Sequence, residues 1–412
     1  MDEKKFAERM QRVEDAVQLK EPDRVPVCLL SSLLPFWLDG CTNKDAMYNY
    51  PRAAEAVVKF HERFPMLDTS AISALASGKA YELAKPQMVD WPGRPGTKVP
   101  DFSTYQVIER EVLKPEEYPE ILADYTGFML RKYIPRIFPG IKGLADIDIN
   151  PSIILGTAPL ASMLSDEALA AYKTLIQMAE EEKKCNAVKD ELNAKITEMG
   201  FPPLITGAGE VPFDIIGDYF RGTMGMFDDL MEREDEIEEL CQIFVDIQIR
   251  NFQYLKTVPL PVKRVFFPFH KGMDGFMSPD QYERLYWRPF RKIVDALIEM
   301  DVTPYLYTEG RYNTRLEQLQ DLPKGKCMIH FENVDMRRAK KLLGDNSCIV
   351  GNFPMVLLDT GTPEQVEEKV KELLDICMPG GGYIFDCDGS VDMARPENLD
   401  AMFHALDKYG HY

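Results

Sequence analysis

The sequence predicts an α/β protein, a (β/α)8 barrel with an N-terminal helix and long helical insertions. Its second half alternates apolar, β-rich runs with amphipathic stretches of helical spacing, and the connections between them are short. This alternation is typical of parallel strands joined by right-handed crossovers. At least six such units fall within about 210 residues, which favours a closed barrel over an open sheet.

The predicted elements follow from local patterns. Apolar strand patterns in the second half lie at 202–209, 262–269, 302–310, 326–332, 348–354 and 382–389. Two of the predicted helices begin with an N-cap residue followed by proline at the first helical position, at Ser278-Pro279 and Thr362-Pro363.

The first half supplies one clear strand, at 25–31, and its other strands are hard to place. Long helical patterns at 113–138 and 164–200 exceed a plain barrel, and we interpret them as insertions that roof the barrel mouth. We therefore expect one barrel domain over residues 1–412, with an N-terminal helix in residues 1–20 and insertions over approximately 110–200.

The composition excludes several classes of function. A net charge of −19 disfavours nucleic-acid binding, which needs Lys and Arg against phosphate, and favours a neutral or cationic ligand or a complementary partner protein. The chain has no apolar run of about 18 residues, so we expect no membrane span. The charged, helical start is unlike a signal peptide, and the eight cysteines show no close CxxC spacing. We expect reduced thiols and a cytoplasmic location.

Polar residues cluster at the ends of the predicted strands. In a (β/α)8 barrel, catalytic groups collect at the carboxyl ends of the strands. Reading the sequence at these ends gives Glu210, His270, Glu309, His330 with Glu332, Asn352, and Asp386 to Asp388. This coincidence predicts an enzyme whose site lies at the barrel mouth.

Five segments spread along the chain resemble one known family. They are EPDRVPV (21–27), GEVPFDIIGDYFRG (209–222), GFMSPDQYERLYWRPFRKI (275–293), VGNFPMVLLDTGTPEQVEEKV (350–370) and ARPENLDAM (394–402). In order and spacing they resemble the uroporphyrinogen decarboxylase superfamily, especially its corrinoid-linked methyltransferases. The resemblance implies a TIM barrel, often a homodimer, and a cobalamin supplied on a separate corrinoid protein.

The chain departs from two branches of that superfamily. The true decarboxylase carries an arginine-rich stretch after its first strand, where this chain reads CLLSSLLPFWLDG (28–40) without arginine. Burying a substrate with many carboxylates there would leave its charges uncompensated. The thiol-methylating members bind zinc through His-x-Cys and a later cysteine. These places fall here on Tyr307-x-Glu309 and on Cys387 or Asp388, so activation of a thiol such as coenzyme M is in doubt.

The resemblance still suggests a Zn2+ site built from other ligands. Glu309 falls at a metal-binding place of the relatives, and His330 lies one strand later, about 5 Å away across the sheet. With Cys387 they would give three ligands and one open position, and His270 or Asp388 are reserves. The alternatives are that Glu309 caps a helix beside Arg311 or Arg315, that His330 is a satisfied core group, or that Glu309 and His330 act as proton donors without metal.

Other residues are candidates for contact with the substrate. We expect Glu309, His270 and Tyr307 to be catalytic, with His270 and Tyr307 contacting the donor oxygen or ring. Tyr307 and Phe353 could sandwich a flat arene at the mouth, and Asn352 and Asp388 would complete the substrate contacts. A loop residue stacked on aromatic rings is the alternative for His270.

The sequence thus predicts a methyltransferase. It would move a methyl group from a small donor, a methoxylated aromatic ether, to the cob(I)alamin of a separate corrinoid protein. The alternatives are a cofactor-independent decarboxylase or lyase acting on a less charged substrate, and a non-catalytic barrel that binds a ligand or a corrinoid protein.

Overall fold

A computed structural model describes residues 2–70, 75–148, 156–161 and 163–412. The strands of the second half form one parallel sheet in chain order, each paired with its neighbour in sequence. These strands are β3 (Gly207–Ala208), β4 (Arg264–Phe269), β5 (Thr303–Arg311), β6 (Met328–Asn333), β7 (Cys348–Gly351) and β8 (Tyr383–Ile384).

Two extended segments of the first half close this sheet into a ring. Val27 forms a parallel bridge with Phe385 just after β8, and the Cys28 amide donates to the Phe385 carbonyl at 3.0 Å. The Asp68 amide donates to the Val27 carbonyl at 2.9 Å, and the Ser70 amide to the Pro202 carbonyl at 2.7 Å. The described segments therefore run once around a barrel, which confirms the predicted (β/α)8 class.

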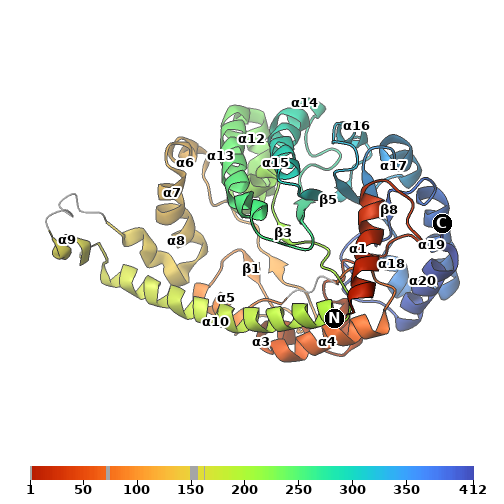
Figure 1. Cartoon of the computed structure of the whole chain (residues 1–412). Helices are drawn as coiled ribbons and strands as arrows, with labels where there is room; N and C mark the ends of the chain where they lie inside the picture. The colour runs from red at the N-terminus through yellow and green to blue at the C-terminus, as the bar shows by residue number, and fades with distance from the viewer. Residues whose placement is uncertain (1, 71–74, 149–155, 162) are drawn as a thin grey trace.

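Helices cover the outside of the ring (Figure 1). Those of the second half are α11 (Pro212–Ile215), α12 (Gly222–Glu232), α13 (Glu234–Phe252), α14 (Pro279–Gln281), α15 (Arg288–Glu299), α16 (Leu316–Leu319), α17 (Met336–Leu343), α18 (Val356–Thr360), α19 (Pro363–Cys377) and α20 (Pro396–Tyr409). Short 3-10 or π segments join several of them: η5 (Ile216–Arg221), η6 (Gln253–Lys256) and η7 (Tyr282–Trp287).

The structure confirms both predicted helix starts. The Ser278 hydroxyl accepts from the Gln281 amide, and the Thr362 hydroxyl accepts from the Gln365 amide, each within a capping box followed by proline. Each cap satisfies amide groups that the first helical turn leaves without an intrahelical partner.

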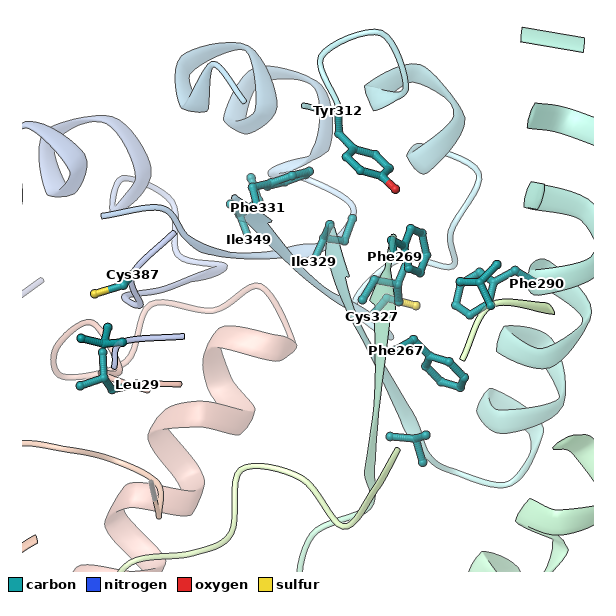
Figure 2. Packing of buried hydrophobic residues seen from close by; sticks show 14 of the residues in the cluster. Leu29, Phe267, Phe269, Phe290, Tyr312, Cys327, Ile329, Phe331, Ile349 and Cys387 are labelled. Atoms are coloured by element: carbon teal, nitrogen blue, oxygen red, sulfur yellow. The ribbon is translucent and has the colours of Figure 1, made fainter. Parts of the chain in front are cut away.

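The strands alternate between two apolar layers. Side chains that point into the barrel form one buried cluster with the helix α1 (Glu3–Val17): Val13, Ala16, Val17, Cys28, Leu30, Leu204, Tyr305, Met328, Cys348, Val350 and Ile384. Arg264, at the start of β4, forms an ion pair with Glu14 of α1, so α1 lies at the amino-terminal end of the barrel. Side chains of the other layer pack between strands and helices, as Phe267, Ile329 and Phe331 do in Figure 2.

The first half also provides helices and a small hairpin. These elements are α2 (Leu34–Leu38), α3 (Asn43–Tyr48), α4 (Tyr50–Arg63), α5 (Gly78–Ala84), and the antiparallel pair β1 (Val89–Asp90) and β2 (Gln106–Val107). None of the helices in the described part of the chain is long and apolar enough to cross a membrane.

The insertions are helical. They comprise η1 (Pro115–Glu117), α6 (Tyr118–Ala123), α7 (Tyr125–Phe128), η2 (Met129–Tyr133), α8 (Ile134–Ile137), η3 (Pro139–Asp146), α9 (Thr157–Ala161) and the 33-residue α10 (Asp166–Glu198). In Figure 1 α9 projects to one side, and α10 runs back from it toward the barrel. α10 packs against α5, α4 and η3.

Candidate active site

The site is built around His270, the residue that follows β4. Its Nδ1 lies 2.5 Å from Oδ2 of Asp218, and its Nε2 lies 3.7 Å from Oε1 of Glu309 at the end of β5. Asp218 comes from η5, a π-helical turn that follows β3, and such turns are frequent at functional sites. Three successive barrel strands thus deliver an acid, an imidazole and a second acid to one place.

A buried carboxylate holds the backbone of His270 in position. Asp214 is fully buried and accepts hydrogen bonds from the amides of His270 at 2.9 Å and Lys271 at 2.8 Å, and from the Tyr286 hydroxyl at 2.6 Å. Burial raises the pKa of Asp214 to about 6. The Lys271 ammonium forms an ion pair with Asp218. Lys271 therefore holds the Asp218 carboxylate, while Asp214 holds the backbone of His270.

The surrounding charges keep His270 protonated. Burial acts against the imidazolium, but the hydrogen bond that Nδ1–H donates to Asp218 and the charges of Asp214, Asp218 and Glu309 raise the pKa of His270 to about 9. Burial raises the pKa of Glu309, which His270 partly offsets. Burial opposes ionisation of Asp218 as well, yet its bonds to His270 and Lys271 lower its pKa. At neutral pH His270 is therefore a cation whose Nε2–H faces Glu309.

Glu210 and Tyr219 form a second polar pair beside it. The Tyr219 hydroxyl donates to Oε1 of Glu210, and burial raises the pKa of both groups. Oε2 of Glu210 is buried and has no hydrogen-bond partner among the described residues. Buried polar atoms of native proteins usually have partners, so this oxygen is available to a ligand or a water molecule.

An apolar cavity of about 750 Å3 opens onto Asp218, Tyr219, His270 and Glu309. The rest of its wall comes from α5, the hairpin β1–β2 and the insertions, and is formed by Ala80, Tyr81, Ala84, Pro86, Met88, Val89, Tyr105, Val107, Glu109, Tyr133, Ile137, Phe138, Met178 and Glu182. A largely apolar cavity with a few convergent polar groups is the usual form of a small-molecule site. It is large enough for a one-ring aromatic compound.

His330, the second predicted metal ligand, is a satisfied core group. Its ring is completely buried, and burial lowers its pKa to about 4. Nε2 donates to the Cys387 carbonyl at 2.6 Å, so Nδ1 of the neutral ring accepts from the Tyr305 hydroxyl at 2.9 Å. Gly351 allows this, since a Cβ there would lie 2.9 Å from His330 Cδ2.

Cys387 points away from the site. Its side chain lies beside Leu29 in the outer hydrophobic layer (Figure 2), and burial raises its thiol pKa well above the usual value. The structure therefore does not bring Glu309, His330 and Cys387 together. Among the described residues, no group of three or more His, Cys, Asp or Glu side chains is placed to hold a metal ion. The predicted zinc ligand set does not fit this geometry.

The remaining predicted contacts fall in three places. Tyr307 stacks on Phe266, with ring centroids 5.8 Å apart, and lies 4.8 Å from the His330 ring, so it contributes to the layer beneath the mouth. Phe353 is fully buried in the outer layer and cannot sandwich an arene with Tyr307, which corrects that expectation. Asn352 and Asp388 line a separate cavity of about 450 Å3.

Asp218, Asp214 and Tyr219 were not singled out from the sequence. All three lie in the 209–222 segment, and Asp214 and Asp218 are four residues apart after a strand pattern. That spacing places both carboxylates on one face of a helical turn and was a readable signal. The cavity wall formed by residues 80–138 carries no comparable signal.

A nuclear magnetic resonance titration tests the His270 cation directly. The chain has five histidines, so their ring resonances can be assigned by substitution. The His270 resonance should titrate near pH 9, because its pKa is raised to about 9. In Asp218→Asn the pKa should fall toward about 6.5, the ordinary value, because the variant loses the charge that favours the imidazolium. An unchanged His270 pKa in Asp218→Asn would contradict the pairing.

Comparisons with known proteins agree with this barrel. The family described as "Uroporphyrinogen decarboxylase (URO-D)" matches residues 165–409. A "Methylcobamide:CoM methyltransferase MtbA" of Methanosarcina acetivorans is 34% identical over 133 residues, and one of Methanosarcina mazei is 34% identical over 130. A uroporphyrinogen decarboxylase of Pseudoalteromonas translucida is 25% identical over 142 residues.

These alignments are partial. Each of the two methyltransferase alignments covers 31% of this chain and 37% of the relative, and the decarboxylase alignment covers 33% and 39%. A solved structure titled "methyltransferase from Methanosarcina mazei" superposes over 97% of this chain and 98% of its own. Its TM-score is 0.59 at 15% sequence identity, so this likeness supports the fold alone.

Proposed function

Because the chain belongs to the uroporphyrinogen decarboxylase family, we propose that it is a methyltransferase acting with a separate corrinoid protein. The two Methanosarcina relatives named methylcobamide:CoM methyltransferases support this reaction class. We propose further that the methyl donor is a methoxylated aromatic ether. The single observation that carries this choice is the aromatic-lined cavity with the His270 imidazolium in its wall.

An aryl methyl ether reacts slowly because its oxygen leaves as an anion. A proton donor beside that oxygen lowers the barrier, and such general acid catalysis typically contributes about 100- to 10,000-fold. His270 fits this role because it lines the cavity, its Nδ1 is held by Asp218, and its Nε2 lies 3.7 Å from Glu309, which lines the same cavity. Glu309 helps to keep the ring protonated.

The proposed step is balanced. The bond between the methyl carbon and the ether oxygen breaks as a bond between cobalt and the methyl carbon forms, the His270 Nε2 proton goes to the oxygen, and the product leaves as a phenol. The corrinoid, a substrate carried by the partner, supplies the electron pair that accepts the methyl group. A proton from solvent then restores the His270 imidazolium. The acid in this step is the His270 imidazolium, a group of the protein itself.

The partner would dock on the rim of the barrel mouth. Exposed apolar side chains follow β4, β7 and β8: Met273 and Met393 lie in loops, and Met355 and Val356 lie at the start of α18. Exposed apolar groups gathered at one end of a molecule are typical of interaction surfaces. These side chains lie at the same end of the barrel as His270. A partner docked there would bring its corrinoid to the side of the barrel where the methyl group is transferred.

The decisive experiment combines purified protein, 2-methoxyphenol and cob(I)alamin. We expect the corrinoid spectrum to change from the reduced to the methylated form, with one demethylated phenol released per methyl group. Omission of the protein is the control. Carbon dioxide release from carboxylated aromatics would instead favour a decarboxylase, and ligand binding without methyl transfer would favour a binding barrel. Either result without methylated corrinoid would contradict the proposal.

A further inference from the structure

The cavity beside His270 has an uneven charge distribution. Four carboxylates contribute to its wall: Glu109, Glu182, Asp218 and Glu309. Among the described residues that line it, none is lysine or arginine, and His270 supplies the one cationic side chain. Lys271 lies close by, but it is buried and forms an ion pair with Asp218.

Two of these carboxylates, Glu109 and Glu182, have no cationic partner among the described residues. Glu182 lies on α10, is half-buried, and forms no hydrogen bond or ion pair with a described residue. Glu109 follows β2 and accepts hydrogen bonds from the amide and hydroxyl of Thr223, both at 2.7 Å, which leave its charge in place. Glu109 is exposed and Glu182 is half-buried, and both add negative charge to the cavity wall without a cationic partner among the described residues.

The remaining wall is aromatic and aliphatic. Tyr81, Tyr105, Tyr133 and Phe138 offer ring surfaces to a flat ligand, and Met88 and Met178 fill the space between them. A neutral aromatic ring can enter such a cavity with favourable apolar burial. A ring that carries a carboxylate would lose hydration beside like charges, and the one cation of the wall, His270, is already paired with Asp218 and Glu309.

We propose that the donor is an uncharged methoxyarene of the methoxyphenol class, and that Glu109 and Glu182 exclude methoxybenzoates. This inference rests on the proposed function, because it specifies the donor of the same site. A phenol belongs to the permitted class because its pKa is about 10, as for tyrosine, so it is un-ionised near neutral pH. Discrimination through a repulsive contact is a general way to obtain specificity.

Two ligands that differ by one carboxylate test the inference. Calorimetry on the full chain measures binding of 2-methoxyphenol and of 4-hydroxy-3-methoxybenzoate, and the corrinoid assay separately measures kcat/KM for each. We expect the neutral ligand to bind at least about tenfold more tightly, in line with the cost of like-charge contacts. In Glu182→Gln the ratio of the two affinities, phenol over benzoate, should fall. In Glu109→Gln/Glu182→Gln this ratio should approach unity.

Matched variants separate local from general charge effects. Glu182→Lys should reverse the preference, because it puts a cation in the wall. Glu180→Gln removes an exposed carboxylate of the same helix that does not line the cavity, and it should leave the ratio unchanged. Thermal unfolding followed by circular dichroism confirms that each variant is folded.

The outcomes for the two proposals are distinct. Equal or tighter binding of the benzoate overturns this inference, even if methyl transfer from both ligands supports the proposed function. Selective binding of the phenol without methyl transfer supports the charge selection and contradicts the proposed function. Absence of binding for both ligands overturns the inference.

Discussion

Replacing His270 with asparagine is expected to lower kcat for methyl transfer by about 100- to 10,000-fold, the usual contribution of a general acid. Asparagine keeps a polar side chain near Asp218 but cannot deliver a proton. Stopped-flow measurement of the corrinoid spectrum gives kcat, and circular dichroism tests whether the fold is retained. KM for the donor should change much less, because the aromatic wall of the cavity remains intact.

The leaving group distinguishes acid catalysis from a structural role. A nitro-substituted aryl methyl ether releases a more stable phenolate and should lose much less rate in His270→Asn than an unsubstituted ether. His404→Asn is the matched control, since His404 is exposed on α20 and should keep the wild-type rate. Equal losses for both ethers would contradict the general-acid role.

The pH profile of the same reaction follows from the sign of the His270 shift. Its pKa is raised to about 9, so the active imidazolium persists through neutral pH. The rate should therefore be level between about pH 7 and 8, above the pKa of Asp214, and fall above pH 9, approaching tenfold per pH unit, as the His270 ring loses its proton. In Asp218→Asn the falling limb should begin at lower pH. A rate that rises through pH 9 would show that neutral His270 is the working form.

Arg221→Met is expected to destabilise the protein by about 3–5 kcal/mol, as is usual when one partner of a buried ion pair is removed. Arg221 and Asp229 are both almost fully buried, and Arg221 Nε lies 2.5 Å from Asp229 Oδ2. The Tyr118 hydroxyl also donates to Asp229, at 2.6 Å. Loss of the guanidinium would leave Asp229 largely buried with less compensation. Urea unfolding followed by circular dichroism measures the free energy of unfolding.

Two comparisons make the stability result specific. Arg63→Met breaks an exposed ion pair with Asp400 and should cost less than about 1 kcal/mol. The double variant Arg221→Met/Asp229→Leu should lose less than Arg221→Met alone, because no unpaired charge remains buried. A loss in Arg221→Met no larger than that in Arg63→Met would contradict the expected role of this pair.

The sequence was sufficient for the barrel because its signals are local. The structure confirms the alternating strand and helix patterns. It also confirms the proline-containing helix starts at Ser278 and Thr362. The strands of the first half are hard to place because their barrel contacts are brief, such as the bridge at Val27 and the two hydrogen bonds between Val27 and Asp68. Their position depends on closure of the ring, which no local pattern encodes.

The site was predictable only in part, and the reason is side-chain direction. His270 and Glu309 come together because parallel strands end at one rim. The place of Cys387 in the chain predicts a position at the mouth, but the residue forms a parallel bridge with Phe353, and both side chains lie in the outer layer. A shift of one residue along a strand changes the face, so a strand end identifies a neighbourhood and not a ligand.

The buried side chains beneath the barrel mouth limit how His270 can regain a proton. Side chains of α1 pack at the amino-terminal end, and the buried His330 ring with its two hydrogen-bond partners lies beneath Tyr307. The His270 side chain is 29% exposed and lines the cavity, so a proton lost from it can return from solvent on that side. Under the proposed function, protons and the corrinoid protein reach His270 through the same opening. A corrinoid protein that stayed bound would therefore block reprotonation of His270 and halt the next cycle.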